Sequence, residues 1–176
     1  LIALKVLKEL IKLNTSFFLN IAGEFQWKNA NKEVKNFIQN NKLDHHIKIY
    51  GRFSQNKAPS IYQNSDILLH LKNKDPCPTV VIEALACGLP VIGSESGGLK
   101  ELVKNESGKL LKVKDSWDED FYPSKEDIIK SIKEIYNNYE YFSNNARKHA
   151  IEKFNHTNWL KEHDNIFKKI IINDTR

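Results

Sequence analysis

The sequence of 176 residues predicts an α/β fold in one domain: a parallel sheet with helices on both faces and a helical C-terminal tail. Short apolar runs alternate with helix-like segments five times between residues 16 and 113. The segments between consecutive runs are far too long for hairpin turns, so each strand needs a crossover to the next. Beyond residue 120 the periodicity becomes purely helical.

The first part of the chain supplies two strands and two helices. Its opening segment carries apolar side chains on one helical face and lysines on the other. The two apolar runs that follow end at Gly23 and Gly51, as buried strands do. The expected elements are a helix over 2–14, a strand over 16–21, a helix over 28–42 and a strand over 47–50.

The middle of the chain repeats this alternation. Its most apolar helix begins with Thr79 as the N-cap and stops at Gly88. The expected elements are a short helix over 58–64, a strand over 67–71, a helix over 79–87, a strand over 90–93, a short helix over 98–103 and a strand over 109–113.

Three helices are expected at the end. Ser124 and Asp127 form a capping pattern for the first, a second runs over 141–154, and a third begins near Thr157. The last has an apolar stripe of Trp159, His163, Ile166, Phe167 and Ile170.

The whole chain, residues 1–176, is therefore expected to form one Rossmann-like domain. In such sheets ligands bind beyond the carboxyl ends of the strands, here residues 23–26, 72–79 and 94–98.

Composition narrows the functional classes. The chain is 40% hydrophobic and 28% charged, which is typical of a soluble globular domain. Its net charge is +5, but 24 of its 27 cations are lysine and no basic stripe forms, so nucleic-acid binding is not expected. Peripheral contact with an anionic membrane fits this charge better than nucleic-acid binding does.

The chain contains no Met and begins at Leu1, which predicts a further N-terminal part.

The cysteines and histidines do not predict a metal site. Cys77 and Cys87 lie ten residues apart, and the six histidines are not at zinc-finger spacing from them. Two isolated cysteines suit a reducing compartment, so a cytoplasmic location is expected.

Two acidic residues are candidates for chemistry. Glu83 is the one charged residue between Pro76 and Ser94. A carboxylate in such surroundings needs a partner, which is either the hydroxyls of a ligand or a structural pair with a lysine or a backbone N–H. Asp75 stands in the loop before the same helix, where it either presents a carboxylate to a ligand or caps the loop.

A pair of glycines follows the fourth strand. Gly97 and Gly98 permit close backbone approach, and the N–H groups after them can hold a phosphate. Taken alone, such a pair is more often a plain turn.

Together these residues resemble a known family. The pattern Asp75-x7-Glu83, the segment 84–92 (ALACGLPVI) and the pattern Gly97-Gly98-x-x-Glu101 are similar to the C-terminal, donor-binding domain of GT-B glycosyltransferases of the family-4 type, the glycosyl transferases group 1. The resemblance runs from about residue 1 to residue 113.

The resemblance implies a retaining glycosyltransferase that moves a sugar from a nucleotide sugar to a polysaccharide or lipid-linked acceptor, without metal or cofactor. Asp75 would contact the transferred sugar and Glu83 the ribose hydroxyls. The donor-binding residues it implies are Gly23, Arg52, Phe53, Cys77, Thr79, Val80, Gly97 and Gly98. The acceptor would bind to an N-terminal domain that precedes Leu1, so this chain alone is expected to be inactive.

Four positions depart from the family pattern. Asp75 replaces the usual Glu, Pro76 and Pro78 stand where glycines are common, and Lys72 occupies a position usually held by Ser. Two alternatives therefore remain: a domain like that of the non-hydrolysing nucleotide-sugar epimerases, and a degenerate domain that binds without catalysis.

Overall fold

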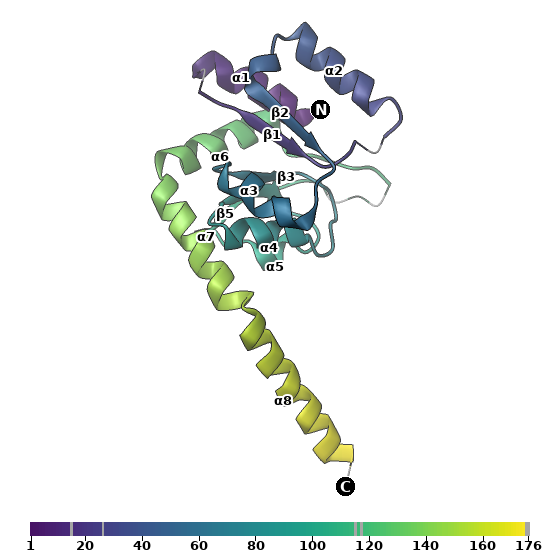
Figure 1. Cartoon of the computed structure of the whole chain (residues 1–176), viewed down its shortest axis with the longest axis vertical. Helices are drawn as coiled ribbons and strands as arrows, with labels where there is room; N and C mark the ends of the chain where they lie inside the picture. The colour runs from purple at the N-terminus through teal and green to yellow at the C-terminus, as the bar shows by residue number, and fades with distance from the viewer. Residues whose placement is uncertain (15, 26, 115, 117, 175–176) are drawn as a thin grey trace.

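The computed structural model describes residues 1–14, 16–25, 27–114, 116 and 118–174, so the last residue of the candidate loop 23–26 lies outside the described part (Figure 1). The strands are β1 (Leu19–Ala22), β2 (Ile47–Gly51), β3 (Leu68–His70), β4 (Val91–Ser94) and β5 (Gly108–Leu111). The helices are α1 (Ile2–Leu13), α2 (Ala30–Asn40), α3 (Ala58–Gln63), α4 (Thr79–Ala86), α5 (Leu99–Leu102), α6 (Lys125–Asn137), α7 (Tyr139–Lys153) and α8 (His156–Asp174), with the 3-10 turns η1 (Asp44–His46) and η2 (Gln55–Lys57). The predicted α/β class is confirmed, and every expected element is present.

All strand pairs are parallel, but the described strands form two sheets, β1-β2 and β3-β4-β5. The sequence predicts one continuous sheet, and the structure divides it between β1 and β3. A side chain joins the two parts there: the Asn20 amide of β1 donates to the Asn64 carbonyl and to Ser65 Oγ, both at 3.0 Å, just before β3. The backbone ladder is thus replaced by side-chain hydrogen bonds at this junction.

Helix α1 packs against both sheets. Its Leu4 is buried in a cluster with Val34 and Ile38 of α2, beside β1 and β2. Its Val6 and Leu10 lie in another cluster, with Ile92 of β4 and residues of α6. Because one amphipathic helix contributes to both cores, it fixes the two sheets relative to each other.

Helix α4, which carries the candidate site, packs against α7. Its Val81, Ala84 and Leu85 are fully buried, in a cluster with Ala146 and Ala150 of α7. Neighbouring strand β4 is buried along its whole length. The start of α4 is therefore positioned by a close-packed core.

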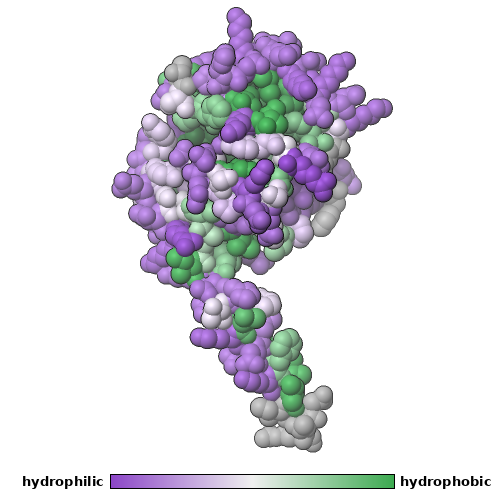
Figure 2. Space-filling model, viewed as in Figure 1, coloured by the Kyte–Doolittle hydropathy of each residue, from purple (hydrophilic) through white to green (hydrophobic). Residues whose placement is uncertain are grey.

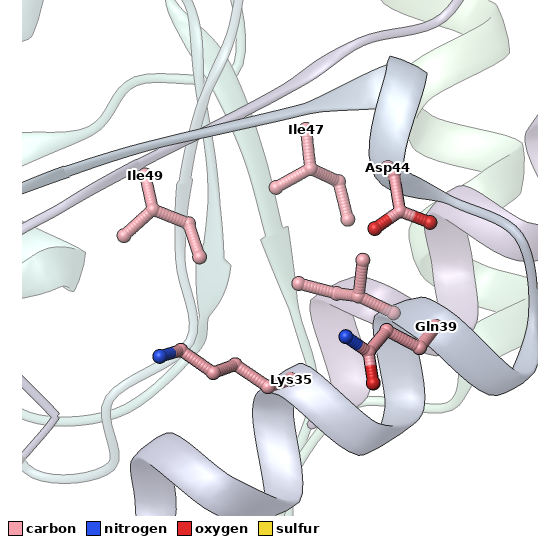
Figure 3. A pocket seen from close by; sticks show the side chains of 6 residues that line it. Lys35, Gln39, Asp44, Ile47 and Ile49 are labelled. Carbon is pink, nitrogen blue, oxygen red and sulfur yellow. The ribbon is translucent and has the colours of Figure 1, made fainter.

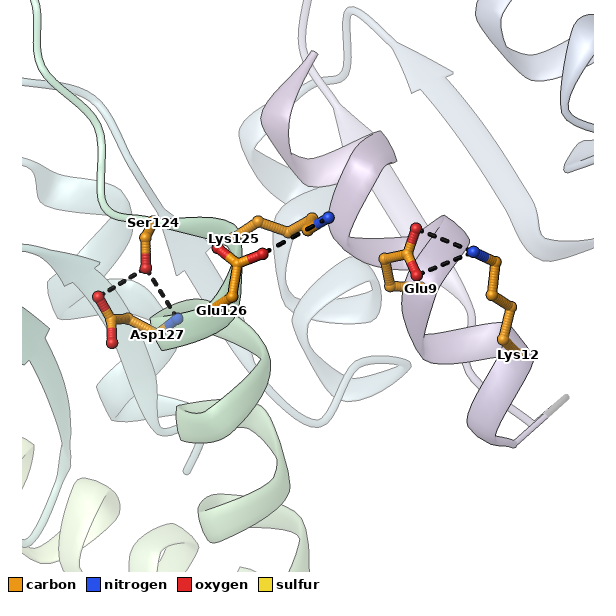
Figure 4. Close-up of polar contacts among 6 residues, drawn as sticks. All are labelled: Glu9, Lys12, Ser124, Lys125, Glu126 and Asp127. Atoms are coloured by element: carbon orange, nitrogen blue, oxygen red, sulfur yellow. Dashed lines mark hydrogen bonds and ion pairs between the residues drawn. The ribbon is translucent and has the colours of Figure 1, made fainter.

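One of the two predicted helix caps is confirmed. Ser124 Oγ accepts a hydrogen bond from the Asp127 N–H at 3.0 Å and donates to the Asp127 carboxylate at 2.6 Å (Figure 4). The prediction that Thr79 is an N-cap is wrong, because Pro78 takes that position with φ −73° and ψ 97°. The proline ring fixes φ and its extended ψ ends the loop, so Thr79 is already the first helical residue.

Helix α8 extends away from the rest of the molecule (Figure 1). Apolar side chains lie exposed along it (Figure 2). They are Trp159, Leu160, Ile166, Phe167, Ile170 and Ile171. Within the described residues, none of the helices combines the length and apolar character needed to cross a membrane.

Candidate functional site

Two loops meet beyond the carboxyl ends of β3 and β4. One joins β3 to α4 and carries Asp75; the other joins β4 to α5 and carries the glycine pair. The Gly98 N–H donates to the Asp75 carbonyl at 2.9 Å, and the Lys74 N–H donates to Ser96 Oγ at 3.1 Å. These two hydrogen bonds fix the backbone of Asp75 against the neighbouring loop.

The glycine pair is required by this contact. Gly97 has φ +57°, and a Cβ there would lie 2.4 Å from the Asp75 carbonyl oxygen. A Cβ at Gly98 would lie 2.2 Å from the Pro76 carbonyl oxygen. Both obstacles are backbone atoms, so larger residues do not fit without moving a loop. Because Gly97 and Gly98 have no side chains, their loop can lie directly against the backbone of the Asp75 loop.

The Asp75 side chain has two cationic or polar neighbours. His70 Nε2, at the end of β3, lies 3.4 Å from Asp75 Oδ2, and Lys72 Nζ lies 3.3 Å from the same oxygen. Burial lowers the pKa of His70; Lys72 lowers it further, while the Asp75 carboxylate opposes the shift. The imidazole is therefore neutral near pH 7, and Lys72 supplies the positive charge beside Asp75.

Glu83, the fifth residue of α4, is half-buried, and its partner is a hydroxyl. Tyr62 of α3 donates to Glu83 Oε2 at 2.7 Å. Burial and this hydrogen bond raise the pKa of Tyr62, so the phenol remains a donor at physiological pH. The structural pair with a lysine or backbone N–H considered from the sequence is thus replaced by a tyrosine. No described residue hydrogen-bonds to Oε1.

The remaining candidate residues fall into two groups. Cys77, Thr79 and Val80 are exposed at the start of α4, close in sequence to Asp75. The others lie at the carboxyl ends of the first sheet: Gly23 follows β1, with its N–H donating to the Gly51 carbonyl at 2.9 Å, and Arg52 and Phe53 follow β2. The structure thus assigns one group of candidates to each sheet.

The sequence did not predict the contacts of His70 with Asp75 and of Tyr62 with Glu83. From the sequence, His70 is part of an apolar strand and Tyr62 is part of a short helix. Both contact a candidate acid from another element or loop. The signal available for His70 was its place next to the last residue of the expected strand 67–71, because residues at that end lie near the binding edge of a parallel sheet.

Metal ligands do not gather in the described part of the chain. No group of three or more His, Cys, Asp or Glu side chains there could hold an ion. Cys77 and Cys87 are free and exposed.

A pocket lies elsewhere, between α2, η1 and β2 (Figure 3). Its lining consists of Lys35, Ile38, Gln39, Asp44, Ile47 and Ile49. None of the candidate residues contributes to it, so it is separate from the Asp75 loop.

Strand order and loop positions define a Rossmann-like parallel α/β domain, and comparison with solved structures gives the same fold class. The pneumococcal O-GlcNAc transferase GtfA, solved in complex with UDP and GlcNAc, superposes with a TM-score of 0.75 at 18% identity. The match covers 97% of this chain and 33% of that one. The fold is that of the GT-B glycosyltransferases.

Sequence comparison identifies the family. The model of the glycosyl transferases group 1 matches residues 2–149, and the chain belongs to this family, which confirms the resemblance seen in its motifs. An uncharacterized glycosyltransferase of Methanocaldococcus jannaschii is 30% identical over 128 residues, which are 70% of this chain and 30% of that protein. The glycogen synthase of Aquifex aeolicus is 28% identical over 145 residues, 80% of this chain and 28% of that protein. The chain thus spans less than a third of the length of these relatives.

Proposed function

We propose that this chain binds the nucleotide-sugar donor of a retaining hexosyltransferase. The observation that carries the proposal is the joining of the Asp75 loop to the Gly97–Gly98 loop at the start of α4. Family membership supports it, as does the UDP and GlcNAc held by the pneumococcal enzyme of the same fold.

In this proposal each group of residues has a part of the donor to bind. Asp75 accepts hydrogen bonds from the transferred sugar, and Glu83 accepts them from the ribose through Oε1. The first N–H groups of α4, at Thr79 and Val80, have no intrahelical acceptors and face the diphosphate together with Cys77. Gly97 and Gly98 hold the Asp75 loop in place for this contact. Gly23, Arg52 and Phe53 lie toward the base.

The proposed reaction needs no metal ion. Helix N-termini and cationic side chains offset the charge of a leaving diphosphate, as a metal would. Lys72 is one such cation, 68% exposed and beside Asp75. Because this chain alone is expected to be inactive, the test uses a longer protein that includes the acceptor site. Its transfer activity is expected to be unchanged in EDTA, and loss of activity with recovery on adding Mg²⁺ would contradict metal independence.

The acceptor and the location are also proposals. The chain covers 30% and 28% of the two relatives named above, so we place the acceptor site in residues outside this chain. We propose a polysaccharide or lipid-linked acceptor, and a cytoplasmic enzyme that contacts the inner face of the membrane peripherally. The net charge of +5 supports that contact, because lysines are attracted to anionic lipid surfaces.

Two measurements test the proposal. The chain of 176 residues is titrated with UDP, ADP and GDP by calorimetry, and is then assayed for transfer and for hydrolysis of the matching nucleotide sugar. We expect weak nucleoside-diphosphate binding and no transfer. Absence of binding up to several millimolar would overturn the donor-binding role, and robust transfer would overturn our placement of the acceptor site.

A matched pair of variants separates specific from general charge effects. Glu83→Gln removes the proposed ribose acceptor, whereas Glu106→Gln removes the charge of an exposed acid before β5. The first is expected to weaken nucleotide binding and the second is not. Equal effects would mean that net charge, not the site, controls binding.

A further inference from the structure

His70 occupies an unusual place for an imidazole. It is the last residue of β3, and its side chain is 12% exposed. Its Nε2 is buried and has no hydrogen-bond partner among the described residues. A buried polar nitrogen without a hydrogen-bond partner destabilises the folded state, so its presence here points to a functional role.

The Asp75 carboxylate lies close to this nitrogen. The separation of Nε2 from Oδ2 is 3.4 Å, slightly longer than a well-formed N–H···O hydrogen bond. A small rotation of the Asp75 side chain closes that gap. The reverse arrangement, a deprotonated Nε2 facing a carboxylate oxygen, would set two lone pairs against each other, so Nε2 carries the proton.

The rest of Asp75 is already fixed. Its carbonyl accepts from Gly98, and its loop is closed by the contact of Lys74 with Ser96. The side-chain torsions are the freedom that remains. His70 and Lys72 both contact Oδ2, and no described residue hydrogen-bonds to Oδ1. That oxygen is available for a substrate hydroxyl.

We propose that His70 is a positioning residue for Asp75: its Nε2–H donates to Oδ2 and thereby directs Oδ1 toward the sugar of the donor. This inference rests on the proposed function, in which Asp75 contacts that sugar. Lys72 cannot fix the orientation of the carboxylate in the same way, because its ammonium group is exposed and lies at the end of a flexible side chain. Burial lowers the pKa of His70, so a neutral imidazole orients the carboxylate and leaves its charge for the substrate.

The first test needs no ligand. Long-range ¹H–¹⁵N correlation spectra of the chain report which ring nitrogen of His70 carries the proton at pH 7.5. We expect the neutral, Nε2-protonated tautomer. An Nδ1-protonated ring would overturn the inference.

The second test measures the sugar contact. UDP and UDP-GlcNAc, with UDP-glucose as a second donor probe, are titrated into wild type and variants, and the ratio of the affinity for each nucleotide sugar to that for UDP is compared. His70→Ala is expected to reduce the ratio about five- to tenfold, with the affinity for UDP within about twofold of wild type. His70→Gln, whose amide can donate from a similar position, is expected to restore most of it, and Lys72→Ala to change it less than His70→Ala.

The double variant distinguishes the two proposals. Asp75→Asn is expected to reduce the ratio, and adding His70→Ala to it is expected to cost nothing more, because the two residues act through one carboxylate. An unchanged ratio in Asp75→Asn would overturn the sugar contact itself. A reduced ratio in Asp75→Asn with no effect of His70→Ala, or fully additive effects, would overturn only the positioning role. Unfolding curves of each variant verify that the fold is intact.

Discussion

Tyr62 and Glu83 form a 2.7 Å hydrogen bond between α3 and α4. The phenol donates to Oε2 and stays protonated, since burial and the carboxylate raise its pKa. One oxygen of Glu83 is therefore oriented by the protein, and the other makes no hydrogen bond with any described residue. A carboxylate held in this way can serve both stability and binding, and the two roles respond differently to substitution.

Glu83→Gln is expected to weaken UDP binding and to spare the fold. The amide oxygen can still accept from Tyr62, so no buried group loses its partner. A hydrogen bond to a charged group is worth roughly 1.5–3 kcal/mol, so the affinity for UDP should fall about ten- to a hundredfold. Calorimetric titration with UDP and urea unfolding of the same samples check this. A large loss of stability at unchanged affinity would make Glu83 a structural residue.

Tyr62→Phe changes the same hydrogen bond from the other side. It leaves the carboxylate charge in place and removes its orienting donor. We expect a stability loss of about 0.5–1.5 kcal/mol and a fall in UDP affinity smaller than that of Glu83→Gln. If Tyr62→Phe weakens UDP binding more than Glu83→Gln does, the ribose contact does not belong to Glu83.

The glycine pair allows a comparison of strain with crowding. Gly97 and Gly51 have similar φ angles, +57° and +64°, but a Cβ at Gly51 meets no atom within 4 Å. Gly51→Ala should therefore cost only the left-handed conformation, about 1–2 kcal/mol. Gly97→Ala adds a clash with the Asp75 backbone and should cost about 2–5 kcal/mol in all. Equal losses in urea unfolding would mean that the two loops do not need their close contact.

Most of the fold was predictable because it depends on local periodicity. Helix α1, strand β2 and helix α4 lie within two residues of their expected ranges, and the Ser124 cap follows from a pattern of four residues. The break between β1 and β3 was not predictable. It depends on the Asn20 side chain, which meets residues more than forty positions further along the chain.

The candidate site, like the fold, was predictable from the sequence only in part. Asp75 and the glycine pair were recognisable by spacing, and the structure joins them. The contacts of His70 and Tyr62 are decided by tertiary packing, and neither residue type is diagnostic at its position. At Thr79 two local rules competed: threonine favours the N-cap, but the dihedrals of Pro78 place the cap one residue earlier.

Helix α8 is expected to be dispensable for the stability of the domain. Its described side chains up to Ile171 are exposed, except that His163 is partly covered, and Trp159 of the same helix lies against it with ring centroids 3.8 Å apart. A chain that ends at Asn155 should unfold within about 0.5 kcal/mol of the full chain, as changes at exposed positions usually do. Urea unfolding checks this, and a loss above 2 kcal/mol would contradict it.

A second truncation is the control for the first. A chain that ends at Asn138 also lacks α7, whose Phe142, Ala146 and Ala150 are buried. Loss of a buried phenylalanine alone costs about 3–5 kcal/mol, so this chain should be largely unfolded.

His70 makes the stability of the chain depend on pH. Burial holds its pKa below the ordinary value of 6.5, so the unfolded state takes up this proton at a higher pH than the folded state does. The stabilising contribution is complete above about pH 6.5 and is lost as the pH falls toward the folded-state pKa, with a slope of at most about 1.4 kcal/mol per pH unit. His70→Gln removes this titration. The stability of wild type relative to His70→Gln should therefore decrease between pH 7 and pH 5, and a constant difference would contradict a buried, neutral imidazole.

Two neighbours should move the His70 titration in opposite directions. The Asp75 carboxylate favours the protonated ring and the Lys72 ammonium disfavours it. Asp75→Asn should therefore lower the pKa of His70 further, and Lys72→Ala should raise it. The NMR titration of the His70 ring proton in the three proteins measures both shifts directly. If both variants move the pKa the same way, the shifts come from altered burial, and the imidazole does not face these two charges as the structure has it.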